Sequence, residues 1–386
     1  MTPFVFNTTP SIVFENGSAK KLAAILRGRL GAKILFVTDP GLRSLGLCDP
    51  ALASLTDAGI EVTVFDSVEA DPSLATLMKA VATGRSASAT GVLGFGGGSS
   101  LDVAKLAALL LGSGEDLDQA WGVGNAKGPR LPLALVPTTS GTGSEVTPVS
   151  IITVGEEEKR GVSSPLNLPD IAILDSELTL GLPPAITAAT GVDAMVHAIE
   201  AYASKSANNN PLSKMLAKEA LRLLGANIET AVFDGKNVEA RSAMLLGSML
   251  AGQAFANSPV AAVHALAYPI GGTFHVPHGL SNALVLPHVL RFNAPDAAHL
   301  YAEIASDAFP VLGAEQGTQG RCAAFIEELA GLSARLGLKT RLREVGIGEE
   351  HLGKLATDAM KQQRLLVNNP RDVLEADALA IYRAAW

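Results

Sequence analysis

The spacing of apolar residues changes near the middle of the chain, and this change constrains the fold more than any other feature. Short apolar runs bounded by Gly, Pro and Asp predict strands at 33–39, 60–66, 89–98, 131–139 and 169–175. Segments with helical spacing lie between them, at 19–29, 45–58, 73–86 and 99–111. Strands that alternate with helices predict a parallel α/β sheet covered on both faces.

Beyond the doubled proline at 183–184, almost no strand-like alternation remains. Stretches rich in Ala and Leu predict helices, for example at 212–233, 238–256 and 318–336. A proline at the first helical position suits the start of a helix. We therefore expect an α/β dinucleotide-binding domain at 1–182 and an all-helical metal-binding and catalytic domain at 183–386.

The composition excludes several classes of partner. The 386 residues are 48% hydrophobic and carry a formal net charge of −8, and no run of Lys and Arg is longer than two. A nucleic acid or an anionic membrane is therefore not expected as a partner. Two cysteines argue against a disulfide framework and a thiolate metal site. The start of the chain lacks a signal-peptide pattern, so we expect a cytoplasmic protein. The apolar, alanine-rich sequence favours a homo-oligomer, and we expect a dimer before any larger assembly.

Two loops contain the features of a cofactor site. Residues 94–105 read GFGGGSSLDVAK, and glycines between a strand and a helix let the backbone approach a pyrophosphate at the helix N-terminus. The same glycines also suit an ordinary tight turn. Residues 136–148 read VPTTSGTGSEVTP, in which Thr138, Thr139, Ser140, Thr142 and Ser144 place five hydroxyls after a buried strand, where they can bind phosphate, ribose or the nicotinamide amide. A helix-capping turn is the alternative for this loop.

Asp39 ends the strand predicted at 33–39. An acid there accepts a hydrogen bond from a ribose 2′-hydroxyl and repels a 2′-phosphate, which favours NAD over NADP. A plain Asp-Pro-Gly turn at 39–41 is the alternative. Because the acid precedes the glycines, the order differs from the usual dinucleotide fingerprint.

Four side chains in the second half have the chemistry of a metal site. Asp193 and His197 are four residues apart, which places both on one face of a helix. His264 and His278 follow in apolar surroundings. One carboxylate and three imidazoles suit Fe²⁺, Zn²⁺, Co²⁺ or Ni²⁺ better than Ca²⁺ or Mg²⁺. A single buried histidine is more often a hydrogen-bonded core residue, so the prediction depends on all four.

With these motifs the chain resembles the iron-containing (group III) alcohol dehydrogenases, related in fold to glycerol dehydrogenase and dehydroquinate synthase. The resemblance runs from GGGSSLDVAK through GVDAMVHAIEAY and HALAYPIGGTFHVPHG to NNPRD at 368–372. It implies a metal bound by Asp193, His197, His264 and His278, in a cleft between the two domains. It also implies the cofactor contacts Asp39, Gly97, Gly98, Ser99, Thr138, Thr139, Thr142, Lys159 and Leu178, with Phe255, Val149 and Leu365 as pocket walls.

The chain departs from the family pattern at the proton relay. Many members have a histidine four residues after the first in HAxxH, and Tyr268 stands there in this sequence. Position 275, often Asn in relatives, is His275. The proton path is therefore expected through Tyr268, His275, or water and the cofactor ribose.

The predicted activity is hydride transfer between NAD(H) and a small or apolar alcohol or aldehyde, assisted by Fe²⁺, with Zn²⁺ as an acceptable ion. A maleylacetate reductase or a hydroxyacid–oxoacid transhydrogenase of the same fold is the alternative. Glycine rather than alanine after His278 favours the alcohol dehydrogenase pattern. A dehydroquinate synthase-like lyase is a more distant alternative, since the basic residues for a phosphate are not found near 193–202 or 264–278.

Overall fold

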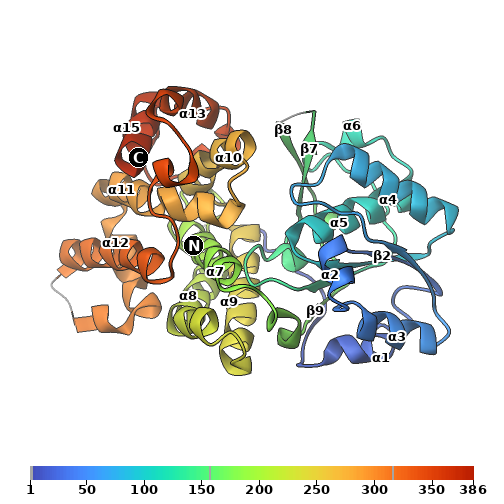
Figure 1. The fold of residues 1–386 in the computed structure, drawn as a ribbon. Coiled ribbons are helices and arrows are strands. Elements are labelled where there is room, and N and C mark those ends of the chain that lie inside the picture. The colour runs from blue at the N-terminus through green and yellow to red at the C-terminus, as the bar shows by residue number, and fades with distance from the viewer. Residues whose placement is uncertain (1–2, 156–157, 315–316) are drawn as a thin grey trace. The chain divides into compact units, whose positions relative to one another are not determined.

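The computed structural model describes residues 3–155, 158–314 and 317–386. The chain divides into two compact units, each described by itself below (Figure 1). The α/β unit comprises Asn7–Thr139 and Gly143–Leu180. The helical unit comprises Gly181–Trp386, together with Ser140–Thr142 and the start of the chain as far as Phe6.

A six-stranded parallel sheet forms the centre of the α/β unit. Its order is β1-β9-β6-β4-β2-β3, and every neighbouring pair is parallel. The strands are β1 (Ile12–Phe14), β2 (Lys33–Val37), β3 (Glu61–Phe65), β4 (Gly91–Gly96), β6 (Leu133–Pro137) and β9 (Ile171–Leu174). Five of them lie within the predicted apolar runs, and the predicted fold class is confirmed.

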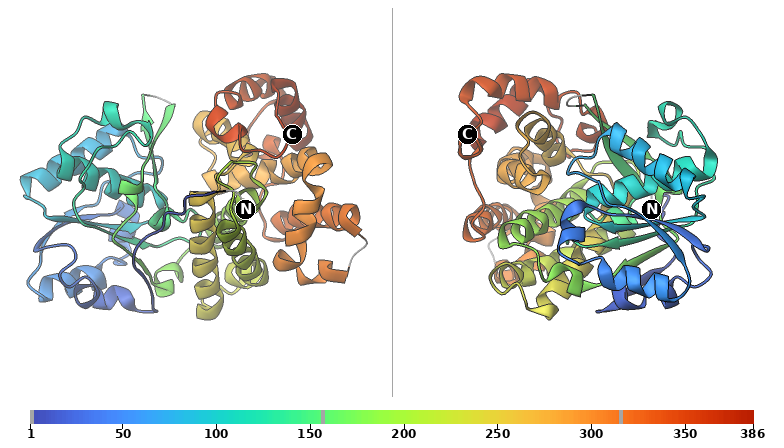
Figure 2. Two further views of the ribbon diagram at one scale, coloured as in Figure 1. Left: turned by 180° about the vertical axis from the view of Figure 1, so that it is seen from behind. Right: turned by 45° about the vertical axis from the view of Figure 1, so that its right-hand side comes forward.

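Alternate residues of β2 and of β6 enter different cores, as a sheet covered on both faces requires. Leu35 and Val37 of β2 pack in one cluster with α4 (Leu74–Ser86) and α5 (Gly98–Ser113). Ile34 and Phe36 pack in the other with η1 (Ser18–Lys21), α1 (Leu22–Ile25) and α3 (Asp49–Asp57). The right-hand view of Figure 2 shows the strands between these two helical layers.

A second, three-stranded sheet was not predicted. It has the order β5-β8-β7, in which β7 (Val149–Val154) and β8 (Glu158–Ser163) are antiparallel and β5 (Gly122–Val123) contributes two residues. The polar sequence EKRGVS of β8 carries no alternation that would have revealed a strand. The remaining elements of this unit are α2 (Pro40–Ser44), α6 (Leu117–Ala120), η2 (Ser144–Val146), η3 (Pro165–Asn167) and η4 (Ser176–Thr179).

The helical unit is built around α7 (Pro184–Ala203), which begins with the second of the two prolines. Every residue from Gly191 to Ala203 is buried, so α7 is surrounded by its neighbours. The other helices are α8 (Pro211–Phe233), α9 (Val238–Asn257), α10 (Ala262–Phe274), α11 (His278–Ala308), α12 (Gly317–Arg335), α13 (Leu352–Ala359), α14 (Gln363–Leu366) and α15 (Glu375–Ala385), with the 3₁₀ turns η5 (Pro310–Ala314), η6 (Leu342–Val345) and η7 (Glu349–His351). The helices predicted at 212–233, 238–256 and 318–336 match α8, α9 and α12.

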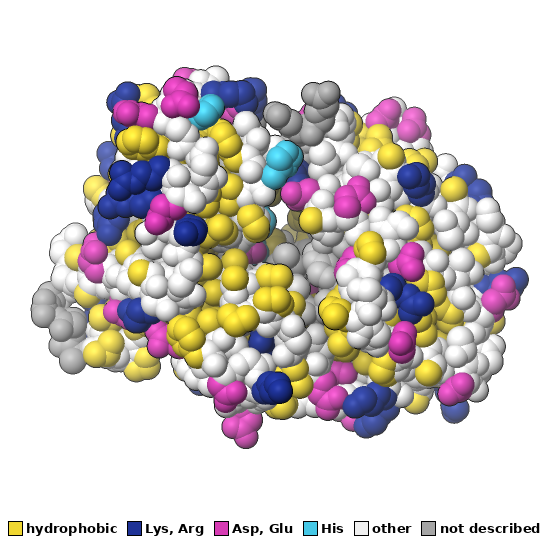
Figure 3. All heavy atoms as spheres, viewed as in Figure 1, with side chains coloured by type: hydrophobic (Ala, Val, Ile, Leu, Met, Phe, Trp, Pro, Cys, Tyr) yellow, Lys and Arg dark blue, Asp and Glu magenta, His cyan; other side chains and the backbone are white. Residues whose placement is uncertain are grey.

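Two surface properties bear on function. No helix in the described ranges is long and apolar enough to span a membrane. On the face drawn in Figure 3, basic and acidic side chains are scattered rather than gathered by sign.

Candidate metal centre and cofactor loops

Residues predicted to hold the cofactor follow four neighbouring strands of the parallel sheet. Asp39 follows β2, Gly97 follows β4, Thr138 follows β6, and Leu178 lies in η4 after β9. The carboxyl ends of parallel strands share one edge of a sheet. The order also reverses between β2 and β4, since β3 lies on one side of β2 and β4 on the other. Such a switch point is where open α/β sheets bind ligands.

The glycine loop leaves helix donors available. Gly97 is the N-cap of α5 and provides no side chain to cap the helix, so the first amides of this 16-residue helix can face an anion. A Cβ built on Gly97 would lie 3.6 Å from Thr139 Cγ2, so the glycine loop and the hydroxyl loop lie against each other. The Thr138 amide also donates to the Gly96 carbonyl at 3.0 Å.

Three predicted or candidate cofactor residues have structural duties as well. Asp39 caps α2, because its Oδ1 accepts from the Leu42 amide at 3.0 Å. Ser144, one of the five hydroxyls, accepts a hydrogen bond from Lys105 and donates one to Asp102. Lys159 lies on β8 of the second sheet and forms an ion pair with Asp71, so it is not among the residues at the strand ends of the large sheet.

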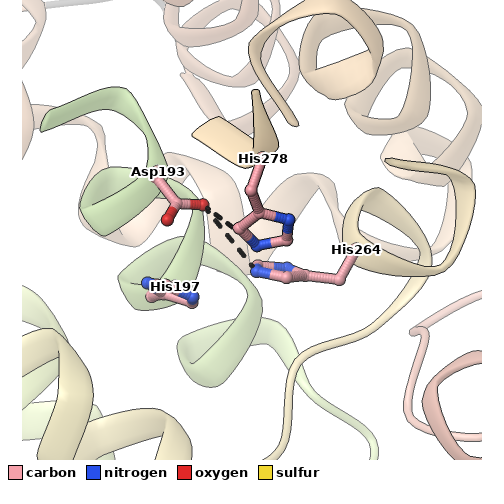
Figure 4. A group of neighbouring side chains, drawn as sticks. All are labelled: Asp193, His197, His264 and His278. Carbon is pink, nitrogen blue, oxygen red and sulfur yellow. Dashed lines mark ion pairs between the residues drawn. The ribbon is translucent and has the colours of Figure 1, made fainter. Parts of the chain in front are cut away.

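The four predicted metal ligands lie together in the helical unit (Figure 4). Each offers one ligand atom, and these atoms all lie within 4.8 Å of one another. Oδ1 of Asp193 is 3.9 Å from His264 Nε2 and 3.7 Å from His278 Nε2. Asp193 and His197 come from consecutive turns of α7, His264 from the first turn of α10, and His278 from the first residue of α11.

Burial and charge keep His197 and Asp193 in the protonation states that a metal requires. Burial lowers the pKa of His197 to about 3, with His264 and His278 adding to the shift and Asp193 opposing it. Burial raises the pKa of Asp193, but the three imidazoles and Asn282 outweigh it and leave that pKa below its ordinary value. A neutral imidazole and an ionised carboxylate are both competent ligands.

Glu200, which sequence reasoning did not single out, orients one of the ligands. It is buried on α7, and its Oε2 lies 2.6 Å from His264 Nδ1 while its Oε1 accepts from the Val263 amide at 2.7 Å. When Nδ1 donates to this carboxylate, the lone pair of Nε2 faces Asp193 and His278. A carboxylate behind a ligating histidine is a common feature of metal sites.

Asn282 was also missed, although it stands four residues after His278, the same spacing as Asp193 and His197. Its Nδ2 donates to Asp193 Oδ1 at 2.6 Å and lies 3.3 Å from Nε2 of both His264 and His278. Its Oδ1 is buried and, within the part of the chain that the structure describes, has no hydrogen-bond partner. The amide therefore contacts the same three atoms that would face an ion.

Gly279 lets α11 start close to α7. A Cβ at this position would lie 2.7 Å from the carbonyl carbon of Ala189, closer still to its oxygen, and 3.3 Å from Asp193 Cβ. An alanine would therefore clash with α7 beside the ligands. The glycine that distinguished the alcohol dehydrogenase pattern in the sequence has a steric reason in this backbone.

The two candidates for the proton relay lie in different settings. The ring of Tyr268 is 5.8 Å from the ring of His278, centroid to centroid. His275 is the C-cap of α10 with φ 55°, a left-handed conformation in which asparagine is also favoured. The end of the helix thus explains why His275 is exposed.

Phe255, a predicted pocket wall, stacks on His197, with 4.4 Å between the ring centroids.

The middle of the hydroxyl loop belongs to the helical unit. A Cβ on Gly141 would lie 2.7 Å from Thr190 Cβ, so the segment Ser140–Thr142 packs against α7 three residues before Asp193. The Gly141 backbone also lies near enough to His197 to raise the pKa of its imidazole slightly against the effect of burial.

Known proteins are similar to this chain over nearly its whole length. Residues 9–176 match the family model for iron-containing alcohol dehydrogenase, and residues 187–386 match the model for the C-terminal part of that family. A long-chain-alcohol dehydrogenase 1 of Geobacillus thermodenitrificans is 44% identical over 368 residues, covering 93% of this chain and 91% of the relative.

Solved structures agree with the sequence matches. A crystal structure of 1,3-propanediol oxidoreductase has a TM-score of 0.95 and 35% identity, with both chains fully covered. A sulfoacetaldehyde reductase from Bifidobacterium kashiwanohense, solved in complex with NAD⁺, has a TM-score of 0.87 and 28% identity and covers 100% of this chain and 99% of its own. The family resemblance seen in the motifs is confirmed: this chain belongs to the iron-containing alcohol dehydrogenases and is an oxidoreductase of that family.

Proposed function

We propose that the protein transfers a hydride between NAD(H) and a small or apolar alcohol or aldehyde at a divalent iron site. The observation that carries the proposal is the convergence of one carboxylate and three imidazoles within 4.8 Å of one another. Residues 1–182 would bind the dinucleotide, and residues 183–386 would hold the metal and the substrate.

The donor set fits such an ion. Imidazole and carboxylate together suit Fe²⁺ and also accept Zn²⁺. Asn282 also supports the fit, because its nitrogen contacts three ligand atoms and its buried oxygen finds no partner among the described residues, which is costly. When bound by Asp193, His197, His264 and His278, the metal supplies Lewis acidity that polarises a carbonyl oxygen or lowers the pKa of an alcohol.

The side chains themselves define how a substrate oxygen approaches. Asp193, His197 and His264 are at most 5% exposed, whereas the His278 side chain is 41% exposed. Solvent and substrate therefore reach the cluster on the side of His278 and Tyr268. On the side of His197, the stacked Phe255 ring helps exclude water. Tyr268 and His275 remain our candidates for proton transfer.

The cofactor proposal rests on the strand-end residues. Gly97, Gly98 and Ser99 would hold the pyrophosphate, and Thr138, Thr139 and Thr142 the nicotinamide half. Leu178 would pack on the adenosine, and Asp39 would select NAD. The order reversal between β2 and β4 supports this location, and the NAD⁺ complex of a structural relative supports NAD(H) as the cofactor.

The experiment is an absorbance screen of NAD(H) turnover over alcohols and aldehydes, repeated after chelation and after restoring Fe²⁺ or Zn²⁺. We expect NADH formation from simple alcohols, lost on chelation and regained with the metal. Product formation without net NADH would favour the lyase alternative. Turnover confined to maleylacetate, or to exchange between hydroxyacids and oxoacids, would favour the other two.

A further inference from the structure

A charged hydrogen-bond network lies beneath the hydroxyl loop, and the proposed function makes no use of it. The ammonium group of Lys105, fully buried on α5, donates to Ser144 Oγ at 2.7 Å, Thr147 Oγ1 at 3.2 Å and the Val149 carbonyl at 2.9 Å. An ammonium group has three donors, so all of them are used. Asp102 accepts from the Ser144 hydroxyl at 2.6 Å and from the Ile151 amide at 2.9 Å.

The hydrogen-bond partners define one direction of donation in this network. Because Ser144 Oγ accepts from Lys105, its single proton goes to Asp102. The order is therefore ammonium to hydroxyl to carboxylate. Removal of either charged partner leaves the other buried without the attraction between the two.

The network links the two cofactor loops through one helix. α5 begins at Gly98 in the glycine loop, and Asp102 and Lys105 follow one and two turns later. Their partners stand where the hydroxyl loop ends, since Ser144 starts η2 and Val149 starts β7. At the other end of the loop, the Thr138 amide donates to Gly96. Both ends of the hydroxyl loop are thus anchored to the segment that carries the glycines.

A gain in the stability of the fold does not by itself explain why such a network is present. A buried ion pair often contributes no more than apolar residues of the same volume would. Burial lowers the pKa of Lys105 to about 8, even though Asp102 and Glu145 oppose the shift, which reflects a large desolvation cost. Fixing the position of the loop is a role that apolar packing would perform less specifically.

We infer that Lys105, Asp102 and Ser144, here named the Lys105 clamp, position the hydroxyl loop against the glycine loop for the nicotinamide dinucleotide. Lys105 is then a positioning residue that touches no cofactor atom. The inference rests on the proposed function, because it assumes that these two loops bind NAD(H).

The test compares full-length Lys105→Met and Ser144→Ala with wild type, with NADH affinity measured by quenching of protein fluorescence. Losing a hydrogen bond to a charged group predicts about tenfold weaker NADH binding. KM for NAD should rise while kcat recovers at saturating cofactor, and the iron content should not change. Matched controls are Lys79→Met, an exposed lysine on α4, and Ser113→Ala, at the far end of α5; both should bind NADH as wild type does.

The possible outcomes distinguish a failure of the Lys105 clamp from a failure of the proposed function. Wild type and variants that bind NADH equally well would refute the clamp alone. A wild-type protein that binds no NADH would refute the proposed function and the clamp together. Should Lys105→Met fail to fold, Ser144→Ala decides, because it removes one oxygen and leaves both charges in place.

Discussion

At the scale of single residues, the ligand side chains depend on neighbours that are not ligands themselves. One carboxylate oxygen of Glu200 accepts a hydrogen bond from His264 Nδ1, and the other accepts one from a backbone amide of α10. Asn282 donates to Asp193. Both residues lie on helices that also carry a ligand, so the same backbone places the ligand and its support.

Glu200→Gln should weaken iron binding. A neutral amide holds the His264 tautomer less firmly, and losing such support typically costs about 10–100-fold in metal affinity. The measurement is iron retention in competition with a chelator. Glu303→Gln, which alters a carboxylate that accepts from Tyr202 in the same unit, is the control. Equal retention by wild type and Glu200→Gln would show that Glu200 does not support the site.

Asp39→Ser should relax cofactor choice toward NADP. Serine can still cap α2, while the charge that would repel a 2′-phosphate is gone. We expect the ratio of kcat/KM for NAD to that for NADP to fall by about tenfold, or 1.4 kcal/mol. Asp116→Ser, at the cap of α6, controls for the lost charge. An unchanged ratio would remove Asp39 from the cofactor site.

Glu145→Gln should change how stability depends on pH. Burial raises the pKa of Glu145 from 4.5 to about 7, while its own backbone amide and Lys105 oppose the shift. The folded state therefore holds this proton more tightly than the unfolded chain, and its contribution is full below pH 4.5 and lost as the pH rises through 7. The loss is about 1.4 kcal/mol per pH unit within that window.

Thermal unfolding at several pH values measures this effect. The Tm of wild type should fall relative to Glu145→Gln between pH 4.5 and 7 and stay parallel outside that range. Glu61→Gln, at an exposed ion pair with Lys33, should follow wild type throughout. Parallel curves for wild type and Glu145→Gln would mean that Glu145 is ionised in the folded protein.

At the scale of elements, the metal centre is a junction of three helices. α7 supplies two ligands from consecutive turns, and α10 and α11 each supply one from their first turn. A ligand at the start of a helix is positioned by the approach of that helix to its neighbours. Close approach of α11 to α7 is therefore as necessary as the ligand types.

Gly279→Ala tests that approach. The added methyl group would meet the Ala189 carbonyl of α7, so α11 must shift and His278 with it. We expect weaker iron retention and a loss of about 1–3 kcal/mol of stability from overpacking. Gly353→Ala on α13, where a Cβ meets nothing within 4 Å, should leave iron retention unchanged. Full iron retention by Gly279→Ala would show that the helix contact does not place His278.

At the scale of the whole molecule, apolar patterning predicted five strands of the large sheet and the helices α8, α9 and α12, and it missed β1 and the second sheet. The runs at β2, β4, β6 and β9 are apolar because both faces of the sheet are buried. β8 escaped prediction because its residues are mostly polar and its pairing with β7 and β5 makes it a strand.

The same limit applies to the site. The four ligands were predictable because histidine and aspartate at these spacings are unusual in an apolar sequence. Glu200 and Asn282 were not, because the sequence does not show whether a glutamate or asparagine on a helix is buried or exposed. Only the packing of the helices shows this. Lys105 was hidden likewise, since its partners lie about 40 residues later in the sequence.

The metal assignment is tested most directly by measuring iron content, turnover and NADH affinity together in His264→Ala, with the exposed His299→Ala as control. We expect His264→Ala to lose iron and turnover in parallel while NADH binds as in wild type, and His299→Ala to lose none of the three. Full turnover by His264→Ala without bound metal would contradict the metal assignment.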